Sequence, residues 1–225
     1  MYLSFLDFKT NYLNLSEFSL LQDKYLFYLR KPAWIPSSFW EKKSVLNFIE
    51  NKELKFKSFL ENQLKNFIKQ EEFGLLNRLD NDTSWFLYFA KSKEIYEKFK
   101  ESQKLNKIHK IYYAKVESKN LKKGLNFVID SPIMHKNKSK MIVIKTKFDE
   151  KKGRGKKHFV KTLVEVVEIE NNYAWLKVKI TKWIRHQIRV HLASMWLPIV
   201  WDKLYGWKLS DRLYLFSVGI KDCND

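Results

Sequence analysis

The chain has 225 residues, enough for one large domain or two small ones, and its single cysteine, Cys223, excludes a disulfide framework and a cysteine-based zinc site. Its 43 lysines and arginines outnumber its 25 aspartates and glutamates, which gives a formal net charge of +18 at pH 7. This excess predicts a polyanionic partner, either a nucleic acid or an anionic membrane surface. No apolar run reaches the length of a transmembrane helix and no signal peptide is evident, so we expect a cytoplasmic protein.

In our prediction residues 1–19 favour no element, and strands, a turn and a helix follow in the first third of the chain. An apolar, aromatic pattern over 18–29 predicts strands that end at Arg30-Lys31-Pro32. Pro32 and Pro36 bracket a turn that contains Trp34. Apolar residues recur at helical spacing over 56–68, with lysine and glutamate between them, which predicts a helix with one face on the core and a solvated basic face.

A polar segment at 77–85, Asn-Arg-Leu-Asp-Asn-Asp-Thr-Ser-Trp, lies between two apolar runs. The run that follows it, Phe86 to Ala90, is typical of a buried strand. Charged residues beside a buried strand are costly unless they are paired or used in function. The residues alone leave two alternatives: a polar turn in which Asp82 or Thr83 bonds local backbone, or a functional site.

The rest of the chain predicts mostly strands. Ser92 is placed to cap a helix that runs to about Leu105. Strands are expected over 108–116, 159–169, 173–180 and 213–220, and Ile188 and Leu192 fit one helix face. The basic stretch 135–161, with Gly153 and Gly155 inside it, predicts a flexible hairpin tip that is either a solvated loop or an RNA-backbone contact. Because strands outnumber helices, the expected fold class is α+β, a mainly antiparallel mixed sheet with flanking helices.

Four separate stretches together resemble the motifs of the RluA-type RNA pseudouridine synthases, in the order in which that family carries them. They cover roughly residues 20–220. They are Lys31-Pro32-Ala33-Trp34, the segment Gly74 to Lys91 around Arg78-Leu79-Asp80, Lys110 to Val116, and Arg185 to Leu192 followed by Pro198 to Gly206.

The resemblance implies a single catalytic domain over 1–225 with a central active-site cleft, and without the N-terminal S4-type domain that the family often carries. The reaction it implies breaks the N1–C1′ bond of uridine, turns the base over and rejoins it through C5, with no metal and no cofactor. In this resemblance Asp80 is the nucleophile and Tyr112 stacks on the uracil and takes the C5 proton. Arg189 corresponds to the arginine that pairs with the catalytic aspartate and keeps it charged.

The resemblance also implies RNA as the partner, either ribosomal RNA or tRNA, bound by a monomer that needs no membrane. Arg78 corresponds to the side chain that flips the target base or fills the gap it leaves. The other candidate RNA-binding residues are basic or polar. Two of these motifs supply Lys110, Arg185, His186 and Gln187, and the basic stretch 135–161 supplies Lys151, Lys152, Lys156 and Lys157. A catalytically impaired relative that binds or chaperones RNA is the alternative function.

Tryptophan stands where the family has glycine at five positions: Trp34, Trp85, Trp183, Trp196 and Trp201. The chain has only 6 glycines, well below the usual share of about 7%, and as many as 8 tryptophans. One codon would explain both numbers, because some bacteria read UGA as glycine whereas the commoner reassignment reads it as tryptophan. The alternative is genuine tryptophan with compensating changes elsewhere.

Overall fold

The computed structural model describes residues 3–11, 19–37, 57–67, 69–117, 120–206 and 212–223. The chain divides into two compact units. The first unit is Leu6–Lys107, and the second unit combines Met1–Phe5 with Ile108–Asp225. The prediction of one catalytic domain over the whole chain stays a prediction. Predicted residues 56 and 68 at the ends of the first helix lie outside the described residues.

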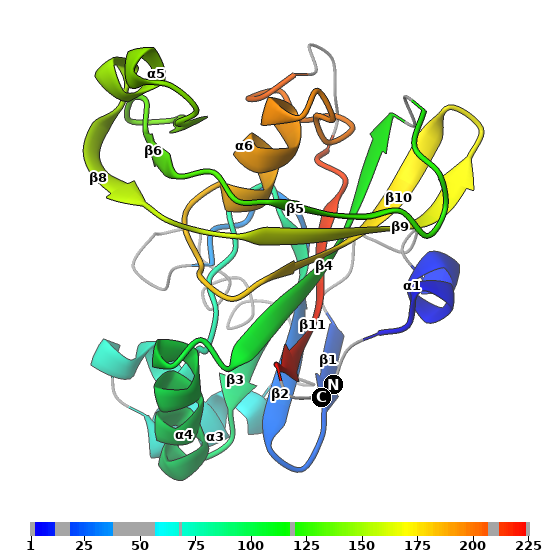
Figure 1. Ribbon diagram of the computed structural model, residues 1–225. Helices are drawn as coiled ribbons and strands as arrows, with labels where there is room; N and C mark the ends of the chain where they lie inside the picture. Colours follow the sequence, from blue (N-terminus) through cyan, green and yellow to red (C-terminus); the bar gives the residue numbers. More distant parts are fainter. Residues whose placement is uncertain are drawn as a thin grey trace. The chain divides into compact units, whose positions relative to one another are not determined.

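The first unit is built on a three-stranded antiparallel sheet with helices beside it (Figure 1). Its elements in chain order are α1 (Phe5–Asn11), whose first residue belongs to the second unit, β1 (Ser19–Gln22), β2 (Leu26–Lys31), α3 (Lys57–Asn66), the 3-10 segment η2 (Lys69–Gly74), β3 (Ser84–Ala90) and α4 (Lys93–Lys104). The strands, α3 and α4 confirm the prediction, whereas no pattern in the sequence indicated α1.

Aromatic side chains form the core of the first unit. Phe59 of α3 lies between Phe27 of β2 and Phe89 of β3, and both ring centroids are 5.1 Å from that of Phe59 in edge-to-face geometry. Edge-to-face packing of this kind adds to the free energy gained by burying the rings. Every residue of β3 is buried, as its uninterrupted apolar run predicts, and this strand therefore gives the polar segment before it a rigid support.

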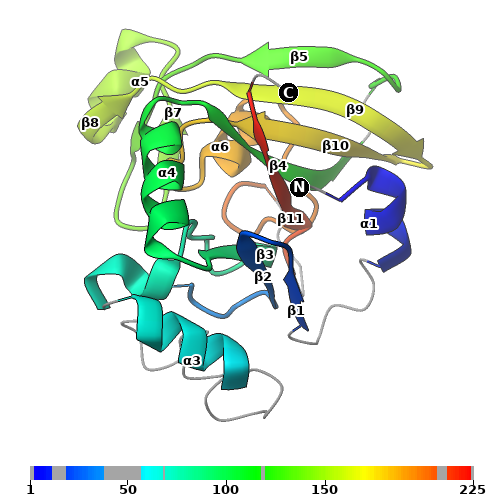
Figure 2. The same cartoon turned by 90° about the horizontal axis from the view of Figure 1, so that it is seen from below.

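The second unit contains a five-stranded antiparallel sheet, in the order β11-β4-β10-β9-β5, and a three-stranded sheet, β7-β6-β8 (Figure 2). Its elements are β4 (Ile108–Glu117), β5 (Asn126–Ile129), β6 (Ile133–His135), β7 (Met141–Val143), α5 (Lys147–Lys152), β8 (Arg154–His158), β9 (Thr162–Glu170), β10 (Tyr173–Ile180), α6 (Gln187–Ser194) and β11 (Leu215–Asp222).

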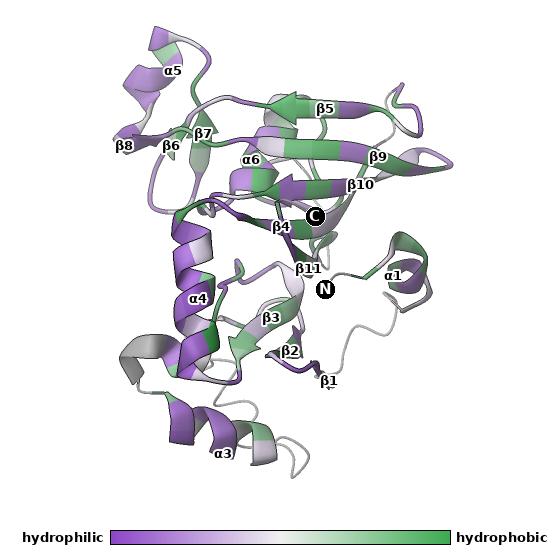
Figure 3. Cartoon of the chain, turned by 60° about the horizontal axis from the view of Figure 1, so that its bottom comes forward, coloured by the Kyte–Doolittle hydropathy of each residue, from purple (hydrophilic) through white to green (hydrophobic). Residues whose placement is uncertain are grey.

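The larger sheet has the alternation that half-buried strands require. In β10, Leu176, Val178 and Ile180 are buried while the lysines between them are half-buried, and hydrophobic and hydrophilic bands alternate along β9 and β10 in Figure 3. The α+β class is therefore confirmed. Every strand pairing within either unit is antiparallel in the described part of the chain.

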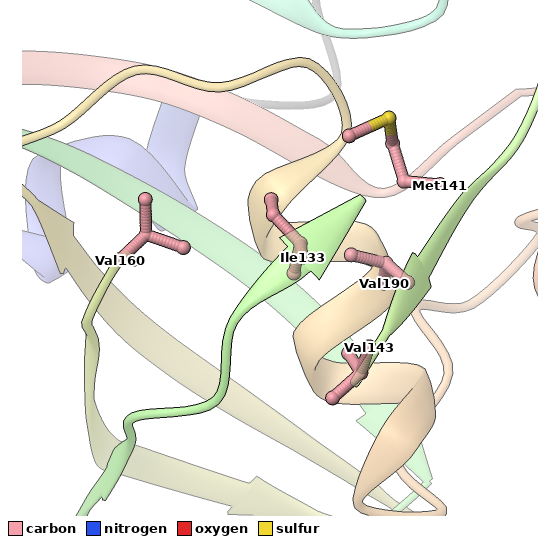
Figure 4. Packing of buried hydrophobic residues seen from close by; sticks show 5 residues of the cluster. All are labelled: Ile133, Met141, Val143, Val160 and Val190. Carbon is pink, nitrogen blue, oxygen red and sulfur yellow. The ribbon is translucent and has the colours of Figure 1, made fainter. Parts of the chain in front are cut away.

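A small apolar cluster joins α6 to the three-stranded sheet. Figure 4 shows its side chains pointing toward one another from β6, β7, α6 and the segment before β9: Ile133, Met141, Val143, Val190 and Val160. All five are buried, so the lysine-rich three-stranded sheet is packed firmly against α6, which contains most of the Arg185-to-Leu192 motif.

The prediction of a flexible hairpin tip within 135–161 is wrong. This segment begins at the last residue of β6 and contains β7, the helix α5 and β8. The Thr146 hydroxyl accepts from the Asp149 N–H, and the Asp149 carboxylate accepts from the Thr146 N–H, which is a reciprocal capping box. Gly153 ends α5 with its N–H on the Glu150 carbonyl. The density of lysines obscured this cap in the sequence.

Candidate active-site regions

Asp80 begins a tight turn directly before the buried strand β3. The Thr83 N–H donates to the Asp80 carbonyl at 3.0 Å, which closes the turn over residues 80–83. Asp80 and Asp82 are half-buried, and Asn81 between them is exposed. The local-turn interpretation is therefore correct for the backbone, and the same turn presents a partly solvated carboxylate.

Lys31 is the buried cation that holds this turn. Its ammonium donates to the carbonyl oxygens of Pro32, Ile35 and Asn81 at 2.9, 2.8 and 3.1 Å. The side chain has no exposed surface. Burial lowers the pKa of Lys31 to about 7, although the nearby charges of Asp82 and Asp80 act in the opposite direction. Lys31 thus ties the turn at 32–35 to the turn at 80–83.

Further hydrogen bonds fix the segment that leads into Asp80. The Ser37 hydroxyl accepts from the Leu79 N–H at 3.1 Å and donates to the Leu79 carbonyl at 3.0 Å. The Asn77 side chain accepts from the Tyr88 N–H at 2.7 Å and donates to the Phe86 carbonyl at 3.2 Å. Both side chains are buried, so the residues before Asp80 are anchored to β3 on one side and to residue 37 on the other.

Arg78 is exposed and lies beside an acidic partner. Its guanidinium forms an ion pair with Glu72 through two nitrogens, one of them Nε at 3.1 Å from Oε2. An exposed pair of this kind contributes little to stability and exchanges readily. Arg78 is therefore accessible to a partner that can compete with Glu72.

Tyr112 and Lys110 lie on strand β4 of the second unit, between β11 and β10. Tyr112 is opposite Val178 of β10 and Ser217 of β11, and the register of β11 shifts between Ser217 and Gly219. Such bulges re-aim side chains and are frequent beside active sites. Lys110 is almost fully buried, and its Nζ lies 3.4 Å from the centroid of the Trp183 ring, close enough for a cation–π contact.

Arg189 of α6 forms a buried, bidentate ion pair with Asp202. Nε and Nη2 each lie 2.8 Å from a carboxylate oxygen of Asp202, and the two side chains are 3% and 0% exposed. Asp202 also accepts from the N–H groups of Leu204 and Tyr205. A fork of this geometry fixes the loop after residue 198 against α6.

His186 and Gln187 have hydrogen-bond partners within the second unit. His186 Nδ1 is 3.0 Å from the Tyr205 hydroxyl, which also accepts from the Met141 N–H at 2.8 Å. Gln187 donates to the Lys161 carbonyl and to the Thr162 hydroxyl. Both side chains are buried, which favours a structural role for them.

Burial disfavours the charged form of two histidines in this region. Burial lowers the pKa of His186 to about 3, and the positive charges of Arg189 and Arg185 act in the same direction. Burial also lowers the pKa of His191. His191 Nε2 is 2.9 Å from the Ser131 carbonyl, which can only accept, so this nitrogen carries the proton and Nδ1 accepts from Thr162 at 2.8 Å.

Two segments of the second unit are rich in basic residues. The β6–β7 turn (residues 136–140) is organised by Asn137, whose carboxamide oxygen accepts from the N–H groups of Ser139 and Lys140. Arg185 donates to the Lys138 carbonyl at 2.9 Å. In the α5–β8 segment, Lys157 is paired with Glu150 at 2.7 Å and Lys152 lies 4.0 Å from the centre of the Phe148 ring.

The predicted catalytic residues belong to both units: Asp80 to the first, and Tyr112 and Arg189 to the second. Their convergence in one cleft stays a prediction, as does an ion pair between Asp80 and Arg189. The candidate RNA-binding residues Lys151, Lys152 and Lys156 are exposed, Lys157 is half-buried, and Arg185 is exposed.

Sequence reasoning missed the residues that hold these regions in place. Lys31 belongs to the Lys-Pro motif and Asp202 to the stretch after Pro198, but neither was given a role. A lysine that ends an apolar strand and precedes proline is a usable signal, because its stem must follow the strand inward. Among the described residues there is no cluster of side chains suited to a metal ion, and no helix is both long and apolar enough to cross a membrane.

Comparison with known proteins identifies the family. The family of RNA pseudouridylate synthases matches residues 25–194. An uncharacterized RNA pseudouridine synthase of Chloroflexus aurantiacus is 30% identical over 135 residues, which are 59% of this chain and 39% of that protein. The dual-specificity RNA pseudouridine synthase RluA of Vibrio cholerae is 32% identical over 151 residues, 64% of this chain and 56% of that protein. The chain thus spans about half the length of these relatives.

Solved structures share the fold. Human RNA Pseudouridylate Synthase Domain Containing 1 superposes with a TM-score of 0.63 at 15% identity, covering 94% of this chain and 81% of that chain. Human RNA Pseudouridylate Synthase Domain Containing 4 gives 0.59 at 20% identity, covering 95% and 87%. With the family match spanning well over half of the sequence, the chain belongs to the RNA pseudouridylate synthase family.

Proposed function

We propose that this protein isomerises specific uridines to pseudouridine in structured RNA, with Asp80 as the nucleophile. The observation that carries the proposal is the Asp80 turn. Its backbone is fixed by a buried lysine and by the Thr83 hydrogen bond, while the Asp80 side chain is only half-buried. A nucleophile needs this combination of a rigid backbone and access to the substrate. Membership of the family supports the reaction class.

The proposed reaction needs no net addition or removal of atoms. The Asp80 carboxylate attacks C1′, and an ester bond forms as the glycosidic N1–C1′ bond breaks and leaves its electron pair on the uracil. The uracil anion turns within the site and C5 attacks C1′, which breaks the ester bond and frees the Asp80 carboxylate. The proton on C5 is then lost to a base, for which Tyr112 is the candidate, and N1 takes up a proton.

Arg189 is proposed to support the charge of Asp80. Nε and Nη2 of Arg189 bind Asp202, which fixes the plane of the guanidinium. The buried ion pair would hold that group in a fixed position, because a bidentate fork has little rotational freedom. His186 and Gln187 would have an indirect role, because they fix the start of α6 and would not contact the RNA.

The RNA backbone is proposed to contact the basic stretch of the second unit. The β6–β7 turn offers Lys136, Lys138 and Lys140 on a backbone already ordered by Asn137 and Arg185. Lys151, Lys152, Lys156 and Lys157 of the α5–β8 segment would extend the contact. The net charge of +18 supports a polyanionic partner, and phosphate contacts of this kind supply affinity without sequence specificity.

Arg78 would enter the RNA when the target base leaves the stack. In this structure it is exposed and paired with Glu72. RNA phosphate or an unstacked base would replace Glu72 as its partner, and that exchange is inexpensive at a solvated surface.

Ribosomal RNA and tRNA are the proposed substrates. One relative is called a dual-specificity RNA pseudouridine synthase, and another, from Buchnera aphidicola, a ribosomal large subunit pseudouridine synthase C. The test is incubation of the purified protein with rRNA and tRNA from cells that lack the gene, followed by site-by-site detection of pseudouridine. New pseudouridine at defined positions is expected, and RNA binding without any pseudouridine would favour the RNA-chaperone alternative.

A further inference from the structure

Four tryptophans have a backbone conformation that bulky side chains avoid. The φ angles of Trp34, Trp85, Trp196 and Trp201 are 67°, 82°, 61° and 65°. The other described non-glycine residues with positive φ are three asparagines, which tolerate this region, together with Glu72, Phe73 and His186. For a residue as large as tryptophan a positive φ is a genuine outlier, and glycine is the residue that adopts it without steric cost.

Trp196 occupies the position after α6 at which glycine is most favoured. Its N–H donates to the Ala193 carbonyl at 3.1 Å, and the N–H of Leu197 donates to the Leu192 carbonyl at 3.0 Å. These two bonds define a Schellman motif, in which the residue after the C-cap is left-handed and usually glycine. The Trp196 side chain is 83% exposed, so no burial of the indole offsets the backbone cost.

Trp201 and Trp34 occupy the third position of turns. The Asp202 N–H donates to the Ile199 carbonyl at 3.0 Å, which makes Trp201 the third residue of a turn over 199–202. Trp34 is the third residue of the turn over 32–35 and donates its N–H to the Asn81 carbonyl at 2.7 Å. Turns with positive φ at the third residue require glycine or asparagine there.

Trp85 is the buried case. It lies in β3 opposite Lys31 of β2, with only 2% of its surface exposed. Its ring contacts Phe8 at a centroid distance of 5.1 Å, and the Arg30 guanidinium lies 4.8 Å from its centre. A φ of 82° inside a strand is far from the extended range that an L-residue prefers.

The other two described tryptophans behave differently. Neither Trp175 nor Trp183 is among the residues with positive φ. Trp175 lies within β10, is fully buried and packs against Phe5 and Phe216 at centroid distances of 5.9 and 6.1 Å. The φ angle therefore distinguishes the four positive-φ tryptophans from Trp175, whose side chain is part of the core. It gives no support for glycine at position 183.

We infer that residues 34, 85, 196 and 201 are glycine in the protein as its own cell makes it, and that residue 175 is tryptophan. Four glycine-requiring conformations coincide with a chain that has 6 glycines and 8 tryptophans. Reading UGA codons as tryptophan in place of glycine would produce all four at once. Two of these residues lie beside the candidate catalytic turn. The Trp34 N–H donates to the Asn81 carbonyl, and Trp85 follows Thr83 by two positions in the sequence.

The gene and the native protein test this inference directly. UGA codons are expected at 34, 85, 196 and 201 and UGG at 175. Peptides from the protein purified from its own cells are expected to have the mass of glycine at the four positions. UGG codons, or tryptophan in those peptides, at these positions would overturn the inference, and so would glycine at 175.

Paired substitutions test the conformational argument without relying on the gene. At position 196, Trp196→Gly should melt about 2–8 °C higher than Trp196→Ala, because only alanine retains the Cβ that opposes positive φ. The same pair at position 175 is the matched control and should show the reverse order, since glycine weakens a strand interior. Equal melting temperatures for the two variants at 196 would contradict the inference. The comparison is independent of whether the protein is a pseudouridine synthase.

Discussion

Each unit contains one aspartate at the centre of a hydrogen-bonded region, and the two aspartates differ in their burial and in how they are bonded. Asp202 of the second unit is fully buried and receives Arg189 and two backbone N–H groups on its carboxylate. Asp80 of the first unit is half-buried, and the turn around it is fixed through carbonyl oxygens and a lysine. In one region the carboxylate supports the backbone, whereas in the other the backbone supports the carboxylate.

This difference indicates which carboxylate stabilises the fold and which is accessible to a substrate. A carboxylate whose oxygens are saturated by an arginine and two amides is poorly suited to attack a substrate, since it would have to break those bonds first. A partly solvated carboxylate on a rigid turn is more accessible to a substrate than a fully buried one. The comparison therefore favours Asp80 over Asp202 as the proposed nucleophile and leaves Asp202 with the support of α6.

The largest expected effect comes from Asp80. Asp80→Asn keeps the size of the side chain and removes the nucleophile, so pseudouridine formation should fall by at least ~10³-fold. RNA affinity and melting temperature should stay near those of the unmodified protein. Asp82→Asn is the matched control in the same turn and should retain activity. Turnover by Asp80→Asn at the unmodified rate would remove Asp80 from the mechanism.

Asp202 should show the opposite profile, with its main effect on folding. Asp202→Asn leaves Arg189 buried without a counter-charge, which should lower the free energy of unfolding by about 3–5 kcal/mol in chemical denaturation. Replacing both partners, Arg189→Met with Asp202→Leu, should cost less, because no buried charge remains. A loss below about 1 kcal/mol in the single variant would mean that the pair does not support the fold.

The RNA contacts of the second unit should appear in the salt dependence of binding. Changing Lys136, Lys138 and Lys140 to glutamine should reduce the slope of log affinity against log salt by about 2–3. The same change at Lys151, Lys152, Lys156 and Lys157 should reduce it less for each lysine, because Glu150 neutralises Lys157 and Phe148 contacts Lys152. An unchanged slope in both variants would mean that the stretch is solvated surface only.

The most gradual effect, spread over several pH units, concerns Lys31. Its pKa is lowered to about 7 in the folded state from an ordinary 10.5, so the unfolded chain binds this proton more tightly. Between these two values the free energy of unfolding should rise with pH, by on the order of 1 kcal/mol per unit from this group. Lys31→Met should lack this rise when denaturation curves are compared between pH 7 and 10. A parallel pH dependence in the two proteins would show that Lys31 keeps an ordinary pKa.

The sequence alone determined the fold class, most elements and the family. Periodicity located α3, α4, β3 and β10, because the burial of a helix stripe or a strand face is a local property of the pattern. Ser92 as a cap is likewise local, since its hydroxyl accepts from Ile95 three residues away. The motifs and their order indicated the reaction, because each motif is a local sequence pattern that can be identified without the tertiary structure.

Only the tertiary structure decided which polar residues support the site. Lys31 meets Asn81 across 50 positions, Ser37 meets Leu79 across 42, and Gln187 meets Thr162 across 25. No local pattern encodes such partners, because each bond depends on how distant segments pack. The φ angles of the four tryptophans are likewise set by the turns and the cap that surround them. The sequence gives the residue at each position, and the fold decides whether that residue fits there.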